Sequence, residues 1–209
     1  MRTLLLPCIL LLIIYFFHGC TTCTCKKVPC GAFEDVSFQN WFAYQPEQKI
    51  IFKYLATYDT ITLESFYKSE AYEASQGCYN GDEGCNQHVT IASKETATNL
   101  RRKLTLSYGS QIPFGSSDTT KSISLFVQGF NCSASDINDH GLVLLPGLYS
   151  SNYSTTLSIN GITFNNVQTI TRDTTADILA QQPYKVYLSK GTGLMAYEMF
   201  PSHQLWVKQ

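Results

Sequence analysis

The sequence has little charge. Charged residues make up 15% of its 209 residues, and 16 acidic side chains nearly balance 15 basic ones. A nucleic-acid-binding protein needs a basic face to neutralise phosphates. The one basic cluster, Arg101-Arg102-Lys103, stands beside an apolar alternating run and is typical of a solvated strand end. We therefore expect no nucleic-acid partner.

The sequence also lacks the motifs of common enzyme classes. It has no Gly-x-Ser-x-Gly nucleophile motif, no phosphate-binding loop and no His-Glu-x-x-His pair. His88, His140 and His203 lie far apart in the sequence, although the fold could bring them together. The sequence thus indicates no catalytic residue, no metal site and no cofactor, and leaves open an enzyme whose residues converge only in three dimensions.

No apolar run at the N-terminus is long enough to span a membrane. Leu4–Phe17 is a 14-residue apolar run preceded by Arg2. As a helix it would extend about 21 Å, short of a hydrocarbon core of roughly 30 Å. A basic start, a short apolar stretch and a small residue before a cleavage site are typical of a secretory signal peptide. We predict that residues 1–19 are removed and that 190 residues remain, enough for one domain with a core.

The run ends in Phe17-His18-Gly19-Cys20, which resembles the lipobox of bacterial lipoproteins. Gly19 and Cys20 fit that motif, whereas Phe17 and His18 replace its usual Leu and Ala or Ser. The resemblance implies that the Cys20 sulfur carries a diacylglyceryl group that anchors the chain to a membrane; the alternative is that Cys20 forms a disulfide. No acidic run follows Thr21 and Thr22, which favours the periplasmic leaflet of the outer membrane.

The remaining cysteines predict disulfide bonds. Without Cys8 and Cys20, six are left in an oxidising compartment, which permits three bridges and fifteen connectivities. Cys78 and Cys85 flank a turn-forming Gly-rich stretch and form the favoured pair. Cys23, Cys25 and Cys30 lie close together in a tether over residues 20–35. They suit either a soft-metal site or, as we favour, a disulfide clasp with Cys132 as a candidate partner.

From residue 36 onward the pattern predicts a single antiparallel β domain, 36–209. Tyr and Phe are abundant, which favours strands. Period-two alternation recurs in runs that centre on Phe52, Leu63, Leu106 and Leu125. We expect an all-β fold, mainly an antiparallel sheet forming a sandwich or half-barrel, with little helix. The best helical candidate is Thr174–Gln182, ended by Pro183.

Two hairpins are predicted. Asn160-Gly161 favours a two-residue type I′ turn, which pairs Ile159 with Ile162 and Leu157 with Phe164 on one buried face. Ser158 and Thr163 oppose each other on the other face. The second hairpin joins Leu194–Met199 to Gln204–Val207 through a turn at Pro201-Ser202.

Two short motifs have a functional and a plainer interpretation. Asp136-Ile-Asn138-Asp139-His140-Gly141 is similar to the opening of a calcium loop, but the closing Glu position is Gly147, so an Asx-rich turn is favoured. Asn131-Cys-Ser133 and Asn152-Tyr-Ser154 match the N-glycosylation sequon. They matter only if the chain is a eukaryotic secreted, disulfide-bonded glycoprotein.

The C-terminal segment Lys190-Gly-Thr-Gly-Leu-Met-Ala-Tyr-Glu198 and the Asn40-Trp41-Phe42 region resemble small, uncharacterised Bacteroidetes-type periplasmic lipoproteins. That resemblance implies an envelope location and an antiparallel sheet, and it does not indicate a function. We expect a lipid-anchored, non-enzymatic binding or structural module, held to the membrane by its N-terminal lipid, with an unknown protein or small-molecule partner. The alternatives are an envelope hydrolase and the eukaryotic glycoprotein.

Overall fold

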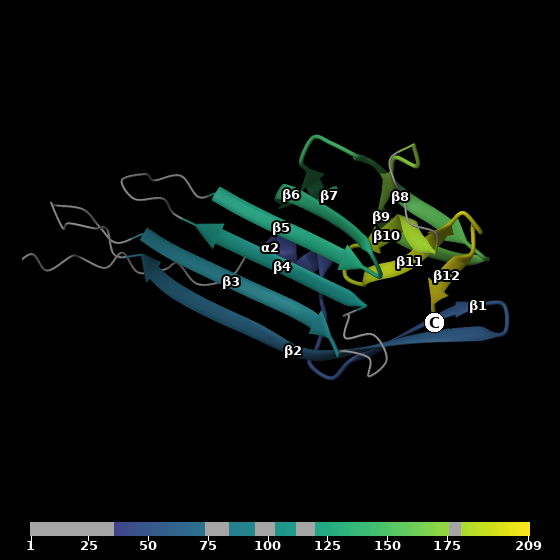
Figure 1. Cartoon of the computed structure of the whole chain (residues 1–209), viewed down its shortest axis with the longest axis horizontal. Coiled ribbons are helices and arrows are strands. Elements are labelled where there is room, and N and C mark those ends of the chain that lie inside the picture. The colour runs from purple at the N-terminus through teal and green to yellow at the C-terminus, as the bar shows by residue number, and fades with distance from the viewer. Residues whose placement is uncertain (1–35, 74–83, 95–102, 112–119, 176–180) are drawn as a thin grey trace, which may run out of the picture.

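The computed structural model describes residues 36–73, 84–94, 103–111, 120–175 and 181–209. These residues form one short helix and twelve strands (Figure 1). In chain order the elements are α2 (Val36–Trp41), β1 (Lys49–Tyr54), β2 (Thr57–Glu73), β3 (Gly84–Ser93), β4 (Leu104–Gln111), β5 (Thr120–Val127), β6 (Phe130–Asn138), β7 (Gly141–Leu144), β8 (Tyr149–Ile159), β9 (Ile162–Arg172), β10 (Gln182–Ser189), β11 (Gly193–Phe200) and β12 (Leu205–Lys208).

The strands form one twelve-stranded sheet in the order β7-β6-β5-β4-β3-β2-β1-β12-β11-β10-β9-β8. Every pair of neighbours is antiparallel, and β12 joins the first strand, β1. The sheet curls into a nearly closed, barrel-like shape (Figure 1). The predicted all-β, antiparallel fold class is confirmed. The two end strands, β7 and β8, are consecutive in the chain, so the sheet closes on itself where the chain passes from one to the other.

The long strand β2 links the two halves of the sheet. Its first residues pair with β1 and its later residues with β3, up to Glu73 opposite Gly84. The register shifts between Leu63 and Ser65, an irregularity of the kind that bends a strand. β2 and β3 are thus adjacent antiparallel strands, and the predicted turn between Cys78 and Cys85 lies largely outside the described residues.

Alternating apolar residues fill the interior, as their period predicted. In β4 Leu104, Leu106 and Tyr108 are buried, and Leu106 lies opposite the buried Leu125 of β5. Burying each large apolar side chain contributes about 1.5–3 kcal/mol. The main core therefore draws on strands from both halves of the sheet.

A helix that the sequence pattern did not predict packs against this core. α2 buries Phe38 and Trp41, and the Trp41 indole Nε1–H donates to the main-chain carbonyl of Asn138, 2.8 Å away. Six residues are too few to show a helical period. The predicted helix over Thr174–Gln182 is wrong where the structure describes it: Thr174 and Thr175 form a turn, and Gln182 and Pro183 begin β10. Residues 176–180 lie outside the described residues.

The Asn160-Gly161 hairpin has the predicted register. Ile159 pairs with Ile162 and Leu157 with Phe164, and the turn residues have φ of +49° and +79°. The predicted burial of all four side chains is wrong for Ile162, which is 42% exposed. The other three join a second apolar cluster, whose buried members are Ile159, Val167, Met195, Ala196 and Val207.

The second hairpin is also confirmed. β11 and β12 pair through Ala196 and Val207, with a turn at Pro201-Ser202 between them. This hairpin brings the end of the chain beside β1 and completes the sheet.

Candidate functional site

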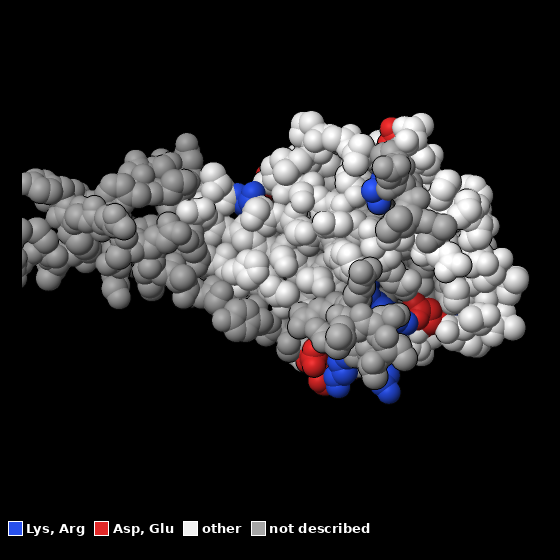
Figure 2. All heavy atoms as spheres, viewed as in Figure 1, with Lys and Arg blue, Asp and Glu red and all other residues white. Residues whose placement is uncertain are grey.

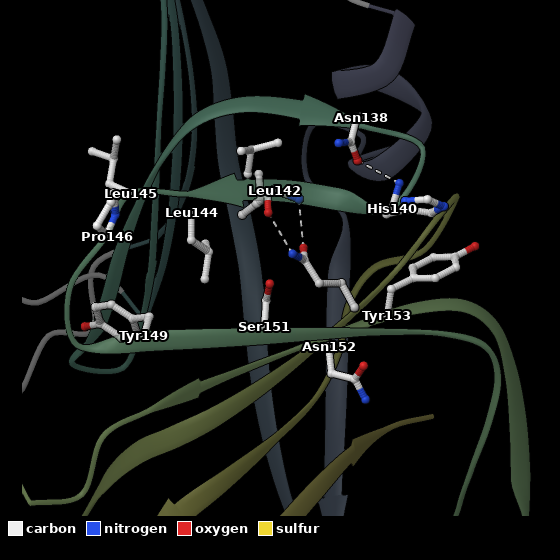
Figure 3. Close-up of a pocket in the computed structure, with 12 residues that line it drawn as sticks. Asn138, His140, Leu142, Leu144, Leu145, Pro146, Tyr149, Ser151, Asn152 and Tyr153 are labelled. Carbon is white, nitrogen blue, oxygen red and sulfur yellow. Dashed lines mark hydrogen bonds between the residues drawn. The ribbon is translucent and has the colours of Figure 1, made fainter.

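A cavity of about 500 Å³ opens where the two ends of the sheet meet, between β7 and β8 (Figure 3). We refer to it as the seam pocket. β7 and the β7–β8 connection supply one side, β8 supplies the other, and one β9 residue lies between them. Its lining residues are Asn138, His140, Leu142, Val143, Leu144, Leu145, Pro146, Tyr149, Ser151, Asn152, Tyr153 and Gln168.

Gln168 holds the two ends of the sheet together. Its amide group accepts a hydrogen bond from the main-chain N–H of Leu142 and donates one to the Leu142 carbonyl, each 2.8 Å long (Figure 3). Gln168 is only 2% exposed. The side chain thus pairs with both main-chain groups of Leu142, as a residue of an adjacent strand would. No strand among the described residues lies on that side of β7.

Gly141 makes room for this amide. It lies at the start of β7 with φ of +109°, and a Cβ atom there would overlap the Gln168 amide. Gly therefore meets two requirements at this position: a left-handed backbone and close approach of a buried side chain. Gly141, the last residue of the Asx-rich turn motif, therefore leaves room for the Gln168 side chain that links the two ends of the sheet.

Aromatic rings form the two ends of the seam pocket. At one end the Tyr149 hydroxyl donates to the main-chain carbonyl of Asn131. At the other, the His140 and Tyr153 ring centroids lie 4.6 Å apart and the Tyr153 hydroxyl donates to Asn166 Oδ1 over 2.8 Å. Burial raises the pKa of Tyr149, so its hydroxyl stays protonated at neutral pH. Both rings are held in place and present apolar surface to the pocket.

No Asp, Glu, Lys, Arg or Cys is among the described residues that line the seam pocket. Asp139, next to the lining residue His140, forms an ion pair with Lys190 at 2.8 Å; the hydrogen bond and charge of Lys190 lower the pKa of Asp139. Apart from His140, the lining offers no side chain that could carry the opposite charge to a buried ligand charge, and burying an unpaired charge is costly. The pocket therefore suits an uncharged ligand.

The calcium-like motif is a turn, as the favoured interpretation predicted. Asn138 Oδ1 accepts from the His140 main-chain N–H at 2.8 Å, the hydrogen bond of an Asx turn. Asp136 Oδ1 accepts from the Ile137 N–H and from Lys121, and Asp139 pairs with Lys190. The oxygen donors thus face different partners. In the part of the chain that the structure describes, no three His, Cys, Asp or Glu residues are grouped to hold a metal ion.

A second, smaller pocket lies over β3, β4 and β5 at Gly109, with a volume of about 420 Å³. We call it the Gly109 hollow. A Cβ atom on Gly109 would lie 2.9 Å from Ser122 Oγ and 3.7 Å from His88 Nδ1. His88 Nε2 in turn lies 2.9 Å from the Thr90 hydroxyl. The hollow thus places a histidine near hydroxyl groups, with no carboxylate among its lining residues.

The third histidine belongs to a separate polar cluster. His203 Nδ1 lies 3.0 Å from Glu198 Oε1 and 3.1 Å from the Tyr184 hydroxyl, which donates to Glu198 over 2.6 Å. Burial acts to raise the pKa of Glu198, but hydrogen bonds with Tyr184, His203 and Lys185 outweigh it and hold that pKa below its usual value. None of these residues lines the two cavities above. The three histidines are therefore not brought into one site.

Most of the predicted site residues lie outside the described residues. These are Cys20, the predicted lipid carrier, and Cys23, Cys25, Cys30 and Cys78. Cys85 is the second residue of β3, and only its backbone is described. Cys132 is a free thiol in β6, 2% exposed, whose pKa burial raises to about 12. The Cys78–Cys85 bridge and the N-terminal clasp remain predictions. Within the described ranges, no helix is long and apolar enough to cross a membrane.

The residues that build the seam pocket were not singled out by sequence reasoning, apart from Asn138, His140 and the sequon Asn152. Gln168 lies in a strand of alternating pattern, and nothing local marks it as the partner of Leu142, 26 residues away.

Charged side chains are sparse on the face shown in Figure 2, and its described residues form no extended basic patch there. Comparison with protein-family models, curated proteins and solved structures finds no match to this chain.

Proposed function

We propose that this protein is a lipid-anchored, non-enzymatic binding module of a bacterial cell envelope and that the seam pocket is its ligand site. The observation that carries the binding role is the pocket itself: a cavity with two fixed aromatic rings and uncharged polar groups. Its volume lies within the range of about 300–1,000 Å³ typical of ligand sites, and its lining holds no carboxylate that could work with His140 as an acid–base pair.

The anchoring role rests on the sequence. An apolar run too short to span a bilayer ends at Gly19-Cys20, and a cysteine at that place supplies the sulfur that receives lipid. A lipid on Cys20 would hold the β domain at the membrane through the residues 20–35 tether, on the periplasmic leaflet of the outer membrane.

Anchoring is tested by growth of expressing bacteria with labelled palmitate. The parent protein is expected to incorporate label and partition with membranes, and Cys20→Ala to lose both properties. Cys23→Ala is the matched control, since it removes a neighbouring thiol and should keep the label. Label retained by Cys20→Ala would disprove lipidation at this residue.

Binding is tested with two tryptophan variants on one strand. Ser151 lines the pocket and its side chain points into it (Figure 3). Ser158 is exposed near the far end of β8 and does not line the pocket. Immobilised parent protein is exposed to a detergent extract of the source bacterium's envelope, and retained mass is measured. Ser151→Trp should lose most of the retained mass and Ser158→Trp should not. Equal retention by both variants would contradict the pocket assignment.

The hydrolase alternative has one supporting observation, the Gly109 hollow, where His88 lies near the hydroxyl groups of Thr90 and Ser122. A nucleophilic serine there would react with a fluorophosphonate probe, and Ser122→Ala would abolish the reaction. Our proposal predicts no labelling of Ser122 in the parent protein.

A further inference from the structure

The two strands that border the seam pocket each have one free edge. Among the described residues, β7 pairs only with β6 and β8 only with β9, and they are the two ends of the sheet. Free strand edges carry unpaired main-chain N–H and C=O groups that can pair with another strand. In this molecule, both free edges border the same cavity.

The hydrogen bonds of Gln168 show which way the β7 edge points. Leu142 directs its N–H and C=O at the Gln168 amide, on the side away from β6. Main-chain groups alternate in direction along a strand, and the Leu145 N–H bonds back to Ser133 of β6. Leu144, between them, therefore directs its N–H and C=O toward the seam pocket, where it is a lining residue.

The β8 edge has none of the usual features that prevent strand addition. Native edge strands are commonly protected by charged residues, by proline or by being very short. β8 has eleven residues, Tyr149–Ile159, and contains neither a charged residue nor proline. β7, with the sequence Gly-Leu-Val-Leu, also lacks both.

Apolar surface beside the cavity could receive side chains of an added strand. Val143 is 40% exposed, and Leu145 and Leu148 are each 48% exposed, on β7 and the connection to β8. The Tyr149 and Tyr153 rings are fixed on the other side by their own hydroxyl hydrogen bonds. With no charged lining residue, the occupant must be uncharged where it is enclosed.

From these observations we infer that the ligand of the seam pocket is an extended, uncharged polypeptide segment that adds as a strand between β7 and β8. This inference rests on the proposed function and names its ligand class. The Gln168 amide already occupies one end of the seam in the manner of a peptide group, and the added segment continues this pairing past Leu144. Because Gln168 already bonds to Leu142, β7 offers the segment the main-chain groups of Leu144, and the eleven-residue edge of β8 offers the rest of the pairing.

The test uses linear seven-residue peptides selected from a phage library on the purified protein. Each selected peptide is resynthesised with a single N-methyl group at successive positions, which removes one main-chain donor and leaves the protein untouched. A strand between two edges directs successive N–H groups to β7 and β8 in turn, so N-methylation at each of several consecutive central positions should lower affinity about tenfold, the value of roughly 1.4 kcal/mol per lost bond. N-methylation at the two ends of the peptide should have little effect. Ser151→Lys should abolish binding, and Ser158→Lys should retain it.

Three outcomes would overturn the inference: no peptide is enriched, N-methylation of the central positions leaves affinity unchanged, or Ser151→Lys binds as well as the parent. Titration with maltohexaose, a neutral oligosaccharide, distinguishes the source of failure. If the oligosaccharide binds and Ser151→Lys abolishes that binding, the peptide inference is wrong and the seam pocket remains a ligand site. If the Ser151→Trp experiment above also fails, the proposed function is wrong as well.

Discussion

Replacement of Gln168 is expected to open the joined ends of the sheet. Gln168→Ala removes both hydrogen bonds to Leu142, whose N–H and C=O lie in a residue only 4% exposed. A buried main-chain group left without a partner costs about 1–3 kcal/mol. Two such groups, less some relief from entering water, give a loss of about 3 kcal/mol. In a domain of this size that corresponds to a fall of about 6–12 °C in melting temperature.

A second substitution gives this prediction a signature in pH. In Gln168→Glu a carboxylate can still accept from the Leu142 N–H, but it faces the Leu142 carbonyl without a proton to donate. Burial and the carbonyl both raise the pKa of that carboxyl above its unfolded value of about 4.3. Its protonated form mimics the amide, so the variant should approach the parent's stability below about pH 4. The stability is then lost as pH rises through the folded pKa.

Thermal melts and hydrogen exchange at the Leu142 amide measure both effects. Thr169→Ala, at the next residue of β9, is the control and should melt close to the parent. The Leu142 amide should exchange slowly in the parent and rapidly in Gln168→Ala. If Gln168→Ala melts within about 1 °C of the parent and keeps the Leu142 amide protected, Gln168 does not join the ends of the sheet.

Three further predictions follow from the fold. Gly161→Val places a β-branched residue at φ of +79°, where residues with a Cβ are strained by about 1 kcal/mol or more; it should lower the melting temperature, and Thr163→Ser, on the opposite face of the hairpin, should not. Non-reducing peptide mapping should find Cys78 linked to Cys85, and a free thiol at both positions in protein from an oxidising compartment would disprove the bridge. The lowered pKa of Glu198 stabilises the fold at pH values above the usual carboxyl pKa of 4.5, and this contribution is lost as pH falls through the folded pKa. Glu198→Gln should therefore make the free energy of urea unfolding depend less on acid pH. An unchanged pH dependence would show that the hydrogen bonds of Glu198 do not stabilise the fold.

The sequence predicted local features well because their causes are local. Alternation placed Leu106 and Leu125 in the core, and the Asn160-Gly161 pair set both the turn and the register of its hairpin. The exposure of Ile162 was not predicted. Strand pairing determines on which face of the sheet a side chain lies, but not whether other residues cover that face. α2 was missed because one and a half turns carry too little pattern.

The seam pocket could not be predicted from the sequence, because it depends on how a long sheet curves. Its defining contact joins Gln168 to the main chain of Leu142. Every residue type has these main-chain groups, so the residue type at position 142 does not indicate that Gln168 binds there. Gly141 had a visible signal as a turn glycine, but its second role, space for the Gln168 amide, depends on the same contact. The histidines were visible in the sequence, and only the fold shows that they lie in three different surroundings.

Hydrogen–deuterium exchange with and without the solubilised envelope extract tests the ligand-site assignment most directly. Our account predicts that the extract slows exchange at Leu144 and along Tyr149–Tyr153, the free edges that border the seam pocket, with no change around Gly109. Protection confined to the Gly109 hollow, or no protection at the seam while the extract still binds, would contradict the assignment of the seam pocket as the ligand site.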